Sequence, residues 1–305
     1  MDSRRHVFAW GGLQLALVAL LLGVSGAVLA EDPPRAAYPD HQQPKDGDPM
    51  SRSSHGRRRA QSRWMVALTF ALAAACGAAE NFTADQLALY DKCETSPPAA
   101  QVRACSTAID SKAFKGMQLA GLHVNRANAY DANGDKGSAL KDYNRALELA
   151  PDNAGIYYNR GVLFVTQGNY DSALKDYNAA LRINPTYVAA LNNRGRLYAF
   201  IHNNSAALAD YSEAIRLEPS APLYQERGSV YVQQHEFQRA LDDENAAIHL
   251  DPSIALAYFF RSMAYGGLGA GDKASADAKT AVHLDPSLEQ FIKLNGQGGA
   301  PTPPK

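Results

Sequence analysis

Hydrophobic residues recur with a helical period through most of the chain. In the stretch DSALKDYNAALRINP, Ala173, Tyr177 and Ala180 fall on one face of a helix, because residues three or four apart lie on the same side. Polar residues occupy the opposite face. Pro185 cannot continue the helix. The pattern therefore predicts an amphipathic helix that ends before this proline, with small alanines that let neighbouring helices approach closely.

The same pattern occurs five times, with a period of 34 residues that shortens to 33 in one unit. Two registers of alanine mark the repeat: Ala139, Ala173, Ala207, Ala240 and Ala274, and then Ala146, Ala180, Ala214, Ala247 and Ala281. A proline closes each unit: Pro151, Pro185, Pro219, Pro252 and Pro286. The predicted units are 120–153, 154–187, 188–220, 221–254 and 255–286.

Each unit contains a turn signal between two helical stretches, such as NGD at 133–135 and QGN at 167–169. Each unit is therefore predicted to be an antiparallel helix pair. The pattern resembles the tetratricopeptide-repeat family. In the second unit the resemblance is carried by Tyr157, Gly161, Phe164, Ala173, Tyr177, Ala180 and Pro185. It implies an all-α, right-handed α-solenoid of stacked hairpins, whose first helices line a concave groove.

One arginine occurs at the same register in every unit, and an aspartate follows it 16 residues later. The arginines are Arg126, Arg160, Arg194, Arg227 and Arg261, and the aspartates are Asp142, Asp176, Asp210, Asp243 and Asp277. A row of ligand-binding arginines would not need a matched carboxylate in each unit, whereas paired side chains within a hairpin would. We interpret the set as a ladder of structural ion pairs, with a ligand-binding row as the alternative. The family usually has leucine in place of this arginine.

The resemblance also indicates which residues line the groove. Carried onto this sequence they are Val124, Asn125, Asn128, Tyr158, Asn159, Val162, Asn192, Asn193, Arg196, Gln225, Glu226, Ser229, Phe259, Phe260 and Met263. Side-chain amides can bond a peptide main chain, and aromatic rings supply apolar contact. Arg196 is the one cation in this set, so we expect a peptide segment rather than a clamped terminal carboxylate. The alternative is a solvated concave surface without a dedicated ligand.

The flanks of the repeats carry further predictions. Residues 80–119 contain a diverged helical hairpin with Asn81 as N-cap. Cys93 and Cys105 fall on its opposing helices and are expected to form a disulfide in an oxidising compartment; two buried free thiols are the alternative. Residues 287–305 comprise a short capping helix and a flexible tail.

The first 79 residues contain two sequences of the export-signal type. Residues 1–30 and 50–79 each place arginines before an apolar run that ends in small residues. We interpret Met50 as the native start and 50–79 as a signal peptide, which makes 1–49 a mis-extended upstream segment. The alternative is that residues 7–30 form an N-terminal membrane anchor. Lipidation of Cys76 is a further alternative to its place in the signal core. Each interpretation puts residues 80–305 outside the cytoplasm, periplasmic or secreted.

Composition and charge narrow the possible functions. The formal net charge of −1 carries no basic footprint for nucleic acid. The glycine-rich stretch 266–273 lacks the glycine that precedes the lysine of a phosphate loop, so we interpret it as a turn. The acidic run 242–244 is interpreted as a solvated face. We find no catalytic set and no metal or cofactor motif.

The sequence thus predicts a non-enzymatic scaffold or adaptor that binds a protein or peptide partner. The alternatives are a self-associating or membrane-anchored assembly protein and, less favoured, an enzyme with a cryptic site. The oligomeric state does not follow from the sequence.

Overall fold

The computed structural model describes residues 83–296, and every regular element within that range is a helix. The segments predicted for export, Cys76 and the tail after residue 296 lie outside the described residues. The chain divides into two compact units: one runs to Ala113 without residues 97–102, and the other contains 97–102 and everything from Phe114 onward. No helix within 83–296 is long and apolar enough to cross a membrane.

The helix α3 (Ala84–Thr95) lies in the smaller unit, and so does α4 (Pro98–Asp110) from Arg103 onward. The N-cap of α3 is Thr83 rather than Asn81, which lies outside the described residues. The Thr83 hydroxyl accepts from the Gln86 amide, and the Gln86 side chain accepts from the Thr83 amide, so the two residues form a capping box. Cys93 and Cys105 are fully buried and joined by a disulfide, with their Cα atoms 4.4 Å apart.

Removing this disulfide is expected to destabilise the smaller unit. Cys93→Ala with Cys105→Ala should lower its free energy of unfolding by about 2–3 kcal/mol, because the bond restricts a short loop of the unfolded chain. Limited proteolysis under increasing urea, followed at α3 and α4, measures the change. Thiol counting on the denatured, unreduced wild-type protein is the control. Two free thiols in the wild type would contradict the prediction.

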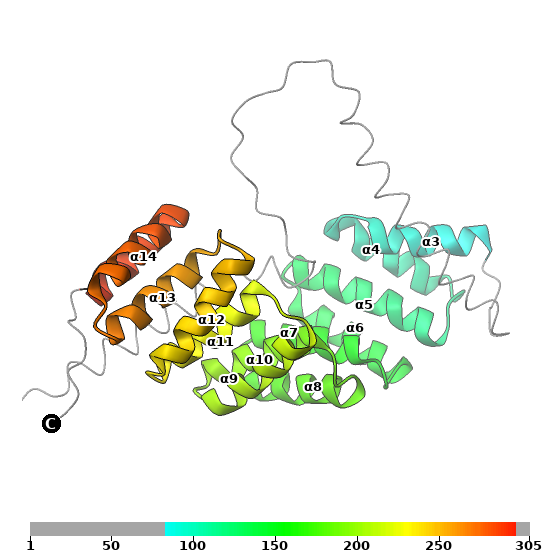
Figure 1. Ribbon diagram of the computed structural model, residues 1–305. Helices are drawn as coiled ribbons and strands as arrows, with labels where there is room; N and C mark the ends of the chain where they lie inside the picture. The colour runs from blue at the N-terminus through cyan, green and yellow to red at the C-terminus, as the bar shows by residue number, and fades with distance from the viewer. Residues whose placement is uncertain (1–82, 297–305) are drawn as a thin grey trace, which may run out of the picture. The chain divides into compact units, whose positions relative to one another are not determined.

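Ten helices form the repeats of the larger unit, and Figure 1 shows them following one another as antiparallel pairs. They are α5 (Gly116–Ala132), α6 (Lys136–Leu149), α7 (Ala154–Thr166), α8 (Tyr170–Ile183), α9 (Val188–Phe200), α10 (Asn204–Leu217), α11 (Ala221–Gln233), α12 (Phe237–Leu250), α13 (Ala255–Gly267) and α14 (Gly271–Leu284). The short helices η2 (Pro286–Leu288) and α15 (Glu289–Gly296) follow. The larger unit is an all-α solenoid, in agreement with the sequence prediction.

The turns within the hairpins share one backbone feature. The residue before each second helix's cap adopts a left-handed conformation, with φ of 82° at Gly134, 72° at Gly168, 76° at Gly269 and 60° at both His202 and His235. Glycine reaches this region without strain, whereas a side chain makes it costly. The glycine-rich stretch 266–273 therefore contains a hairpin turn, as the sequence predicted.

The two alanine registers lie inside the solenoid. All of these alanines are buried except Ala274, which is partly exposed. Consecutive hairpins pack through the pairs α6–α7, α8–α9, α10–α11 and α12–α13. Ala274 lies on α14. This helix is followed by η2 rather than by a sixth hairpin, so the face of α14 that carries Ala274 is covered less completely.

Candidate functional site

The arginine of each repeat is bonded to its own second helix. In all five units, Arg Nε and Nη2 donate to the two carboxylate oxygens of the aspartate 16 residues later, over 2.6–2.8 Å. The aspartates are buried, and the arginine side chains are 18–20% exposed. Two parallel bonds to an ionised acceptor are the strongest arrangement that this pair can make.

Four of the arginines also reach the preceding hairpin, a contact that the sequence did not reveal. Arg Nη1 donates to a side-chain oxygen on the second helix of the repeat before it: Arg160 to Asn144, Arg194 to Asn178, Arg227 to Ser212 and Arg261 to Asn245. Each acceptor follows the ion-pair aspartate by two residues. Each of these arginines therefore links three helices, and its guanidinium is occupied by the solenoid.

Aromatic rings flank the same guanidinium groups. The Cζ atom of Arg160 lies 5.7 Å from the ring centroid of Tyr157 and 5.8 Å from that of Phe164. Arg126, Arg194, Arg227 and Arg261 also lie over tyrosine rings. Arg160 and Arg227 each have two such rings and the other three arginines have one, and each ring adds cation–π attraction. The ladder is therefore part of the packed structure rather than an open row of cations.

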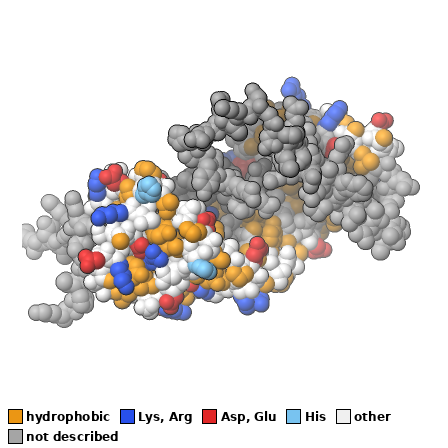
Figure 2. Space-filling model, turned by 45° about the horizontal axis from the view of Figure 1, so that its top comes forward, with side chains coloured by type: hydrophobic (Ala, Val, Ile, Leu, Met, Phe, Trp, Pro, Cys, Tyr) orange, Lys and Arg blue, Asp and Glu red, His pale blue; other side chains and the backbone are white. Residues whose placement is uncertain are grey.

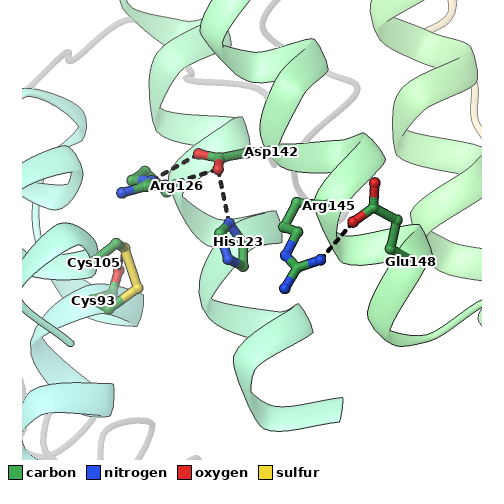
Figure 3. Close-up of polar contacts among 7 residues, drawn as sticks. All are labelled: Cys93, Cys105, His123, Arg126, Asp142, Arg145 and Glu148. Atoms are coloured by element: carbon green, nitrogen blue, oxygen red, sulfur yellow. Dashed lines mark hydrogen bonds and ion pairs between the residues drawn. A yellow bond between two sulfur atoms is a disulfide. The ribbon is translucent and has the colours of Figure 1, made fainter. Parts of the chain in front are cut away.

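The first rung contains an additional residue, His123. Its Nδ1 lies 2.8 Å from Asp142 Oδ1, while Arg126 donates to both oxygens of the same carboxylate, as Figure 3 shows. Burial raises the pKa of Asp142, but the hydrogen bonds from Arg126 and His123 outweigh it and hold this pKa below its ordinary value. His123 is buried and occupies the register of Tyr157. His123 is therefore part of the ladder.

The predicted groove residues divide by exposure. Asn125, Tyr158, Asn159, Asn192 and Arg196 are partly exposed, and Asn128 is exposed. Asn193, Gln225 and Phe259 differ from expectation, because they are buried. Phe259 packs edge-on against Phe260, with ring centroids 5.2 Å apart. Asn193 Nδ2 donates to the Tyr158 hydroxyl over 3.0 Å. Ser229 and Phe260 are buried as well, so these five predicted residues do not line an exposed groove.

The centre of the candidate groove lies on α7, α9 and α11. The Tyr158 ring lies 5.1 Å from that of Tyr187, and burial raises the pKa of Tyr158 to about 12, so its hydroxyl stays neutral. Arg196 Nε lies 3.4 Å from Glu226 Oε1. The Tyr211 hydroxyl donates to the other oxygen of Glu226 over 3.4 Å. This region offers a ring, amides and one charged pair within a short stretch.

An open hollow of about 530 Å³ adjoins this centre. It lies between the start of α5, the α6–α7 connection and the α8–α9 connection, and its lining includes Met117, Pro151, Asp152 and Tyr187. Met117 is 72% exposed. No sequence motif indicates this hollow, because its lining comes from connections and helix starts outside the register that the family indicates.

On the face shown in Figure 2, the described residues give no sign of a nucleic-acid site. Figure 2 shows Lys, Arg, Asp and Glu side chains scattered among hydrophobic ones on the face in view, without a basic strip among the coloured residues. Among residues 83–293, no group of three or more His, Cys, Asp or Glu is placed to hold a metal ion. The solvated-face interpretation of 242–244 was wrong for two residues, because Asp243 and Glu244 are buried while Asp242 is exposed.

Comparison with known proteins decides the family. A family model described as tetratricopeptide repeat matches residues 124–188. The chain contains tetratricopeptide repeats, and its helical solenoid has the fold of that family. No curated protein sequence matched it significantly.

Solved structures share the fold of this tetratricopeptide-repeat protein. A tetratricopeptide-repeat protein from Parabacteroides merdae is 21% identical with a TM-score of 0.55, over 68% of this chain and 86% of that one. YrrB, described as having an unusual peptide-binding site, is 21% identical with a TM-score of 0.54, over 64% and 98%. A protein named MamA is 22% identical with a TM-score of 0.51, over 56% of this chain and 94% of that one. At these identities the likeness establishes the fold alone.

Proposed function

We propose that this tetratricopeptide-repeat protein is an exported scaffold that holds an extended segment of a partner protein along the groove face of α7, α9 and α11. The observation that carries the proposal is the contrast between two rows of side chains. The ladder arginines are bonded within the solenoid, whereas Tyr158, Asn159 and Asn192, one or two residues before a ladder arginine, remain partly exposed. Partly exposed side-chain amides can pair with a peptide backbone, and the Asn192 Oδ1 atom is buried without a hydrogen-bond partner.

The adjoining hollow extends this surface toward α5. Tyr187 belongs to the hollow, and its ring lies tilted against that of Tyr158, so the two areas are continuous. A peptide side chain of apolar character would meet Met117 and Pro151 there, while its backbone followed the amides. YrrB, a protein of the same fold, is described as having a peptide-binding site, and this supports the same class of ligand here.

Binding to the groove is tested with three variants of the full-length chain. Peptides selected from a random display library on the wild type are measured by titration. Asn159→Ala with Asn192→Ala should weaken binding about tenfold or more if these amides contact the peptide. Adding Tyr158→Ala should weaken it further. Lys141→Ala with Lys175→Ala and Gln238→Ala, on exposed parts of second helices, is the matched control.

The outcomes separate a groove from other surfaces. Loss of binding in the amide variant, with unfolding midpoints unchanged, supports the proposal. Equal binding by the amide variant and the control would show that the peptide binds outside the groove. A failure to select any peptide, combined with self-association in light scattering, would favour an assembly role.

Export is the second part of the proposal. It rests on the signal-type sequence at 50–79 and on the disulfide between Cys93 and Cys105, which persists in oxidising compartments. N-terminal sequencing of the native protein tests it. A mature start near Glu80 supports export with cleavage, and a chain that retains residues 7–30 would support the membrane-anchored alternative.

A further inference from the structure

The fourth repeat differs from the first three at one buried position. The residue after the ladder aspartate is Tyr143, Tyr177 or Tyr211 in the first three repeats, but it is Glu244 in the fourth. Glu244 is 0% exposed. An ionisable side chain therefore occupies an interior position that elsewhere holds a ring.

Glu244 makes no compensating hydrogen bond. Neither of its carboxylate oxygens has a partner among the residues that the structure describes. The carboxyl lies against the backbone of α11, since a Cβ atom added at Gly228 would be 2.4 Å from Oε1. Gly161 and Gly195 face the rings of Tyr177 and Tyr211 in the same way. A buried carboxylate without partners is strongly disfavoured, so the carboxyl is held in its neutral form.

The charged groups around Glu244, taken together, also favour its neutral form. Asp243 on its own helix and Glu226 on α11 repel a negative charge, and Arg261 on α13 attracts it. Asp243 is paired with Arg227, and Arg261 is bonded to Asp277 and Asn245. Burial, followed by Asp243 and Glu226, raises the pKa of Glu244 well above the ordinary glutamate value of 4.5.

We propose that Glu244 makes the fourth repeat a proton-dependent joint of the solenoid, in which the neutral carboxyl permits α11, α12 and α13 to pack and its ionisation loosens that packing. The sign follows from linkage. A carboxyl that binds its proton more tightly when folded stabilises the fold most in acid, and this contribution is lost as pH rises from the unfolded value through the folded value. The joint is therefore closed in acid and opens toward higher pH.

The joint lies next to the candidate groove. Glu226 faces Glu244 and also lies 3.4 Å from Arg196 Nε. Loosening of the fourth repeat would therefore displace one side of the groove's charged pair. The joint needs no groove ligand, because it lies in the packing of three helices.

Hydrogen–deuterium exchange of the full-length chain tests the joint. Peptides covering 221–267 are followed between pH 5 and pH 8, with intrinsic exchange corrected. In wild type, each pH unit in which folded Glu244 stays protonated while the opened chain is ionised should raise the opening constant about tenfold. Glu244→Gln should remove this dependence. Asp242→Asn, an exposed acid on the same helix, should keep it.

Two results would overturn the proposal: exchange in 221–267 that is independent of pH in wild type, or the same pH dependence in wild type and Glu244→Gln. Glu244→Met, which has a similar length and no titrating group, serves if the glutamine variant does not fold, and the same flat profile is expected of it. These exchange measurements need no peptide, so they test the joint independently of the proposed peptide binding.

Discussion

Arg194→Ala is expected to lower the free energy of unfolding by about 3 kcal/mol. Arg194 donates two bonds to Asp210, of 2.8 and 2.6 Å, and one of 2.6 Å to Asn178 in the preceding hairpin. Its loss leaves a buried carboxylate without its cation and also removes a link between two repeats. Urea unfolding followed by helical circular dichroism measures the change.

Two control variants isolate the cause. Arg216→Ala removes an arginine that is ion-paired with Glu213 on an exposed part of the next helix, and its unfolding midpoint should stay close to wild type, because such pairs contribute little. Arg194→Leu with Asp210→Leu removes both charges, so it should cost much less than Arg194→Ala. Equal effects of Arg194→Ala and Arg216→Ala would show that the ladder does not stabilise the solenoid.

The repeat architecture could be predicted from the sequence because every unit carries the same local signals. Helical period, turn residues and closing prolines occur in register in five units, so a weak signal in one unit is supported by the other four. The spacing of arginine and aspartate survived the one-residue deletion between Pro219 and Leu223, which indicates that hairpin geometry fixes it. The bond from Arg160 to Asn144 joins different hairpins, and a pattern within one unit could not reveal it.

The groove was less predictable, because a shared register does not guarantee a shared environment. Tyr158 and Phe259 occupy equivalent positions, yet the first is partly exposed and the second is buried. The difference depends on the neighbouring side chains, such as Phe260 against Phe259. Glu244 is a similar case: its charge favours a solvated surface in the sequence, whereas the repeat register places it inside.

Tyr177→Ala is the second large effect that we expect, with a loss of about 3–5 kcal/mol in the free energy of unfolding. The side chain is 2% exposed and packs within a cluster that includes Ala173 and Leu197. Truncation to alanine leaves a cavity between hairpins that fixed helices cannot close. Thermal and urea unfolding of the same preparations measure the loss.

Gly161 supplies the matching half of this contact and allows a double-mutant cycle. A Cβ atom at Gly161 would lie 2.8 Å from Tyr177 Cε1, so Gly161→Ala should cost about 1–3 kcal/mol through overpacking. In the Tyr177→Ala background the ring is absent, so the same substitution should be neutral or stabilise the helix. Gly266→Ala is the control, because a Cβ there meets nothing within 4 Å and alanine favours the helix by up to about 1 kcal/mol. If Gly161→Ala cost the same with and without the tyrosine ring, the close approach of α7 and α8 would not depend on this glycine, and the tyrosine register that Glu244 interrupts would lose its packing role.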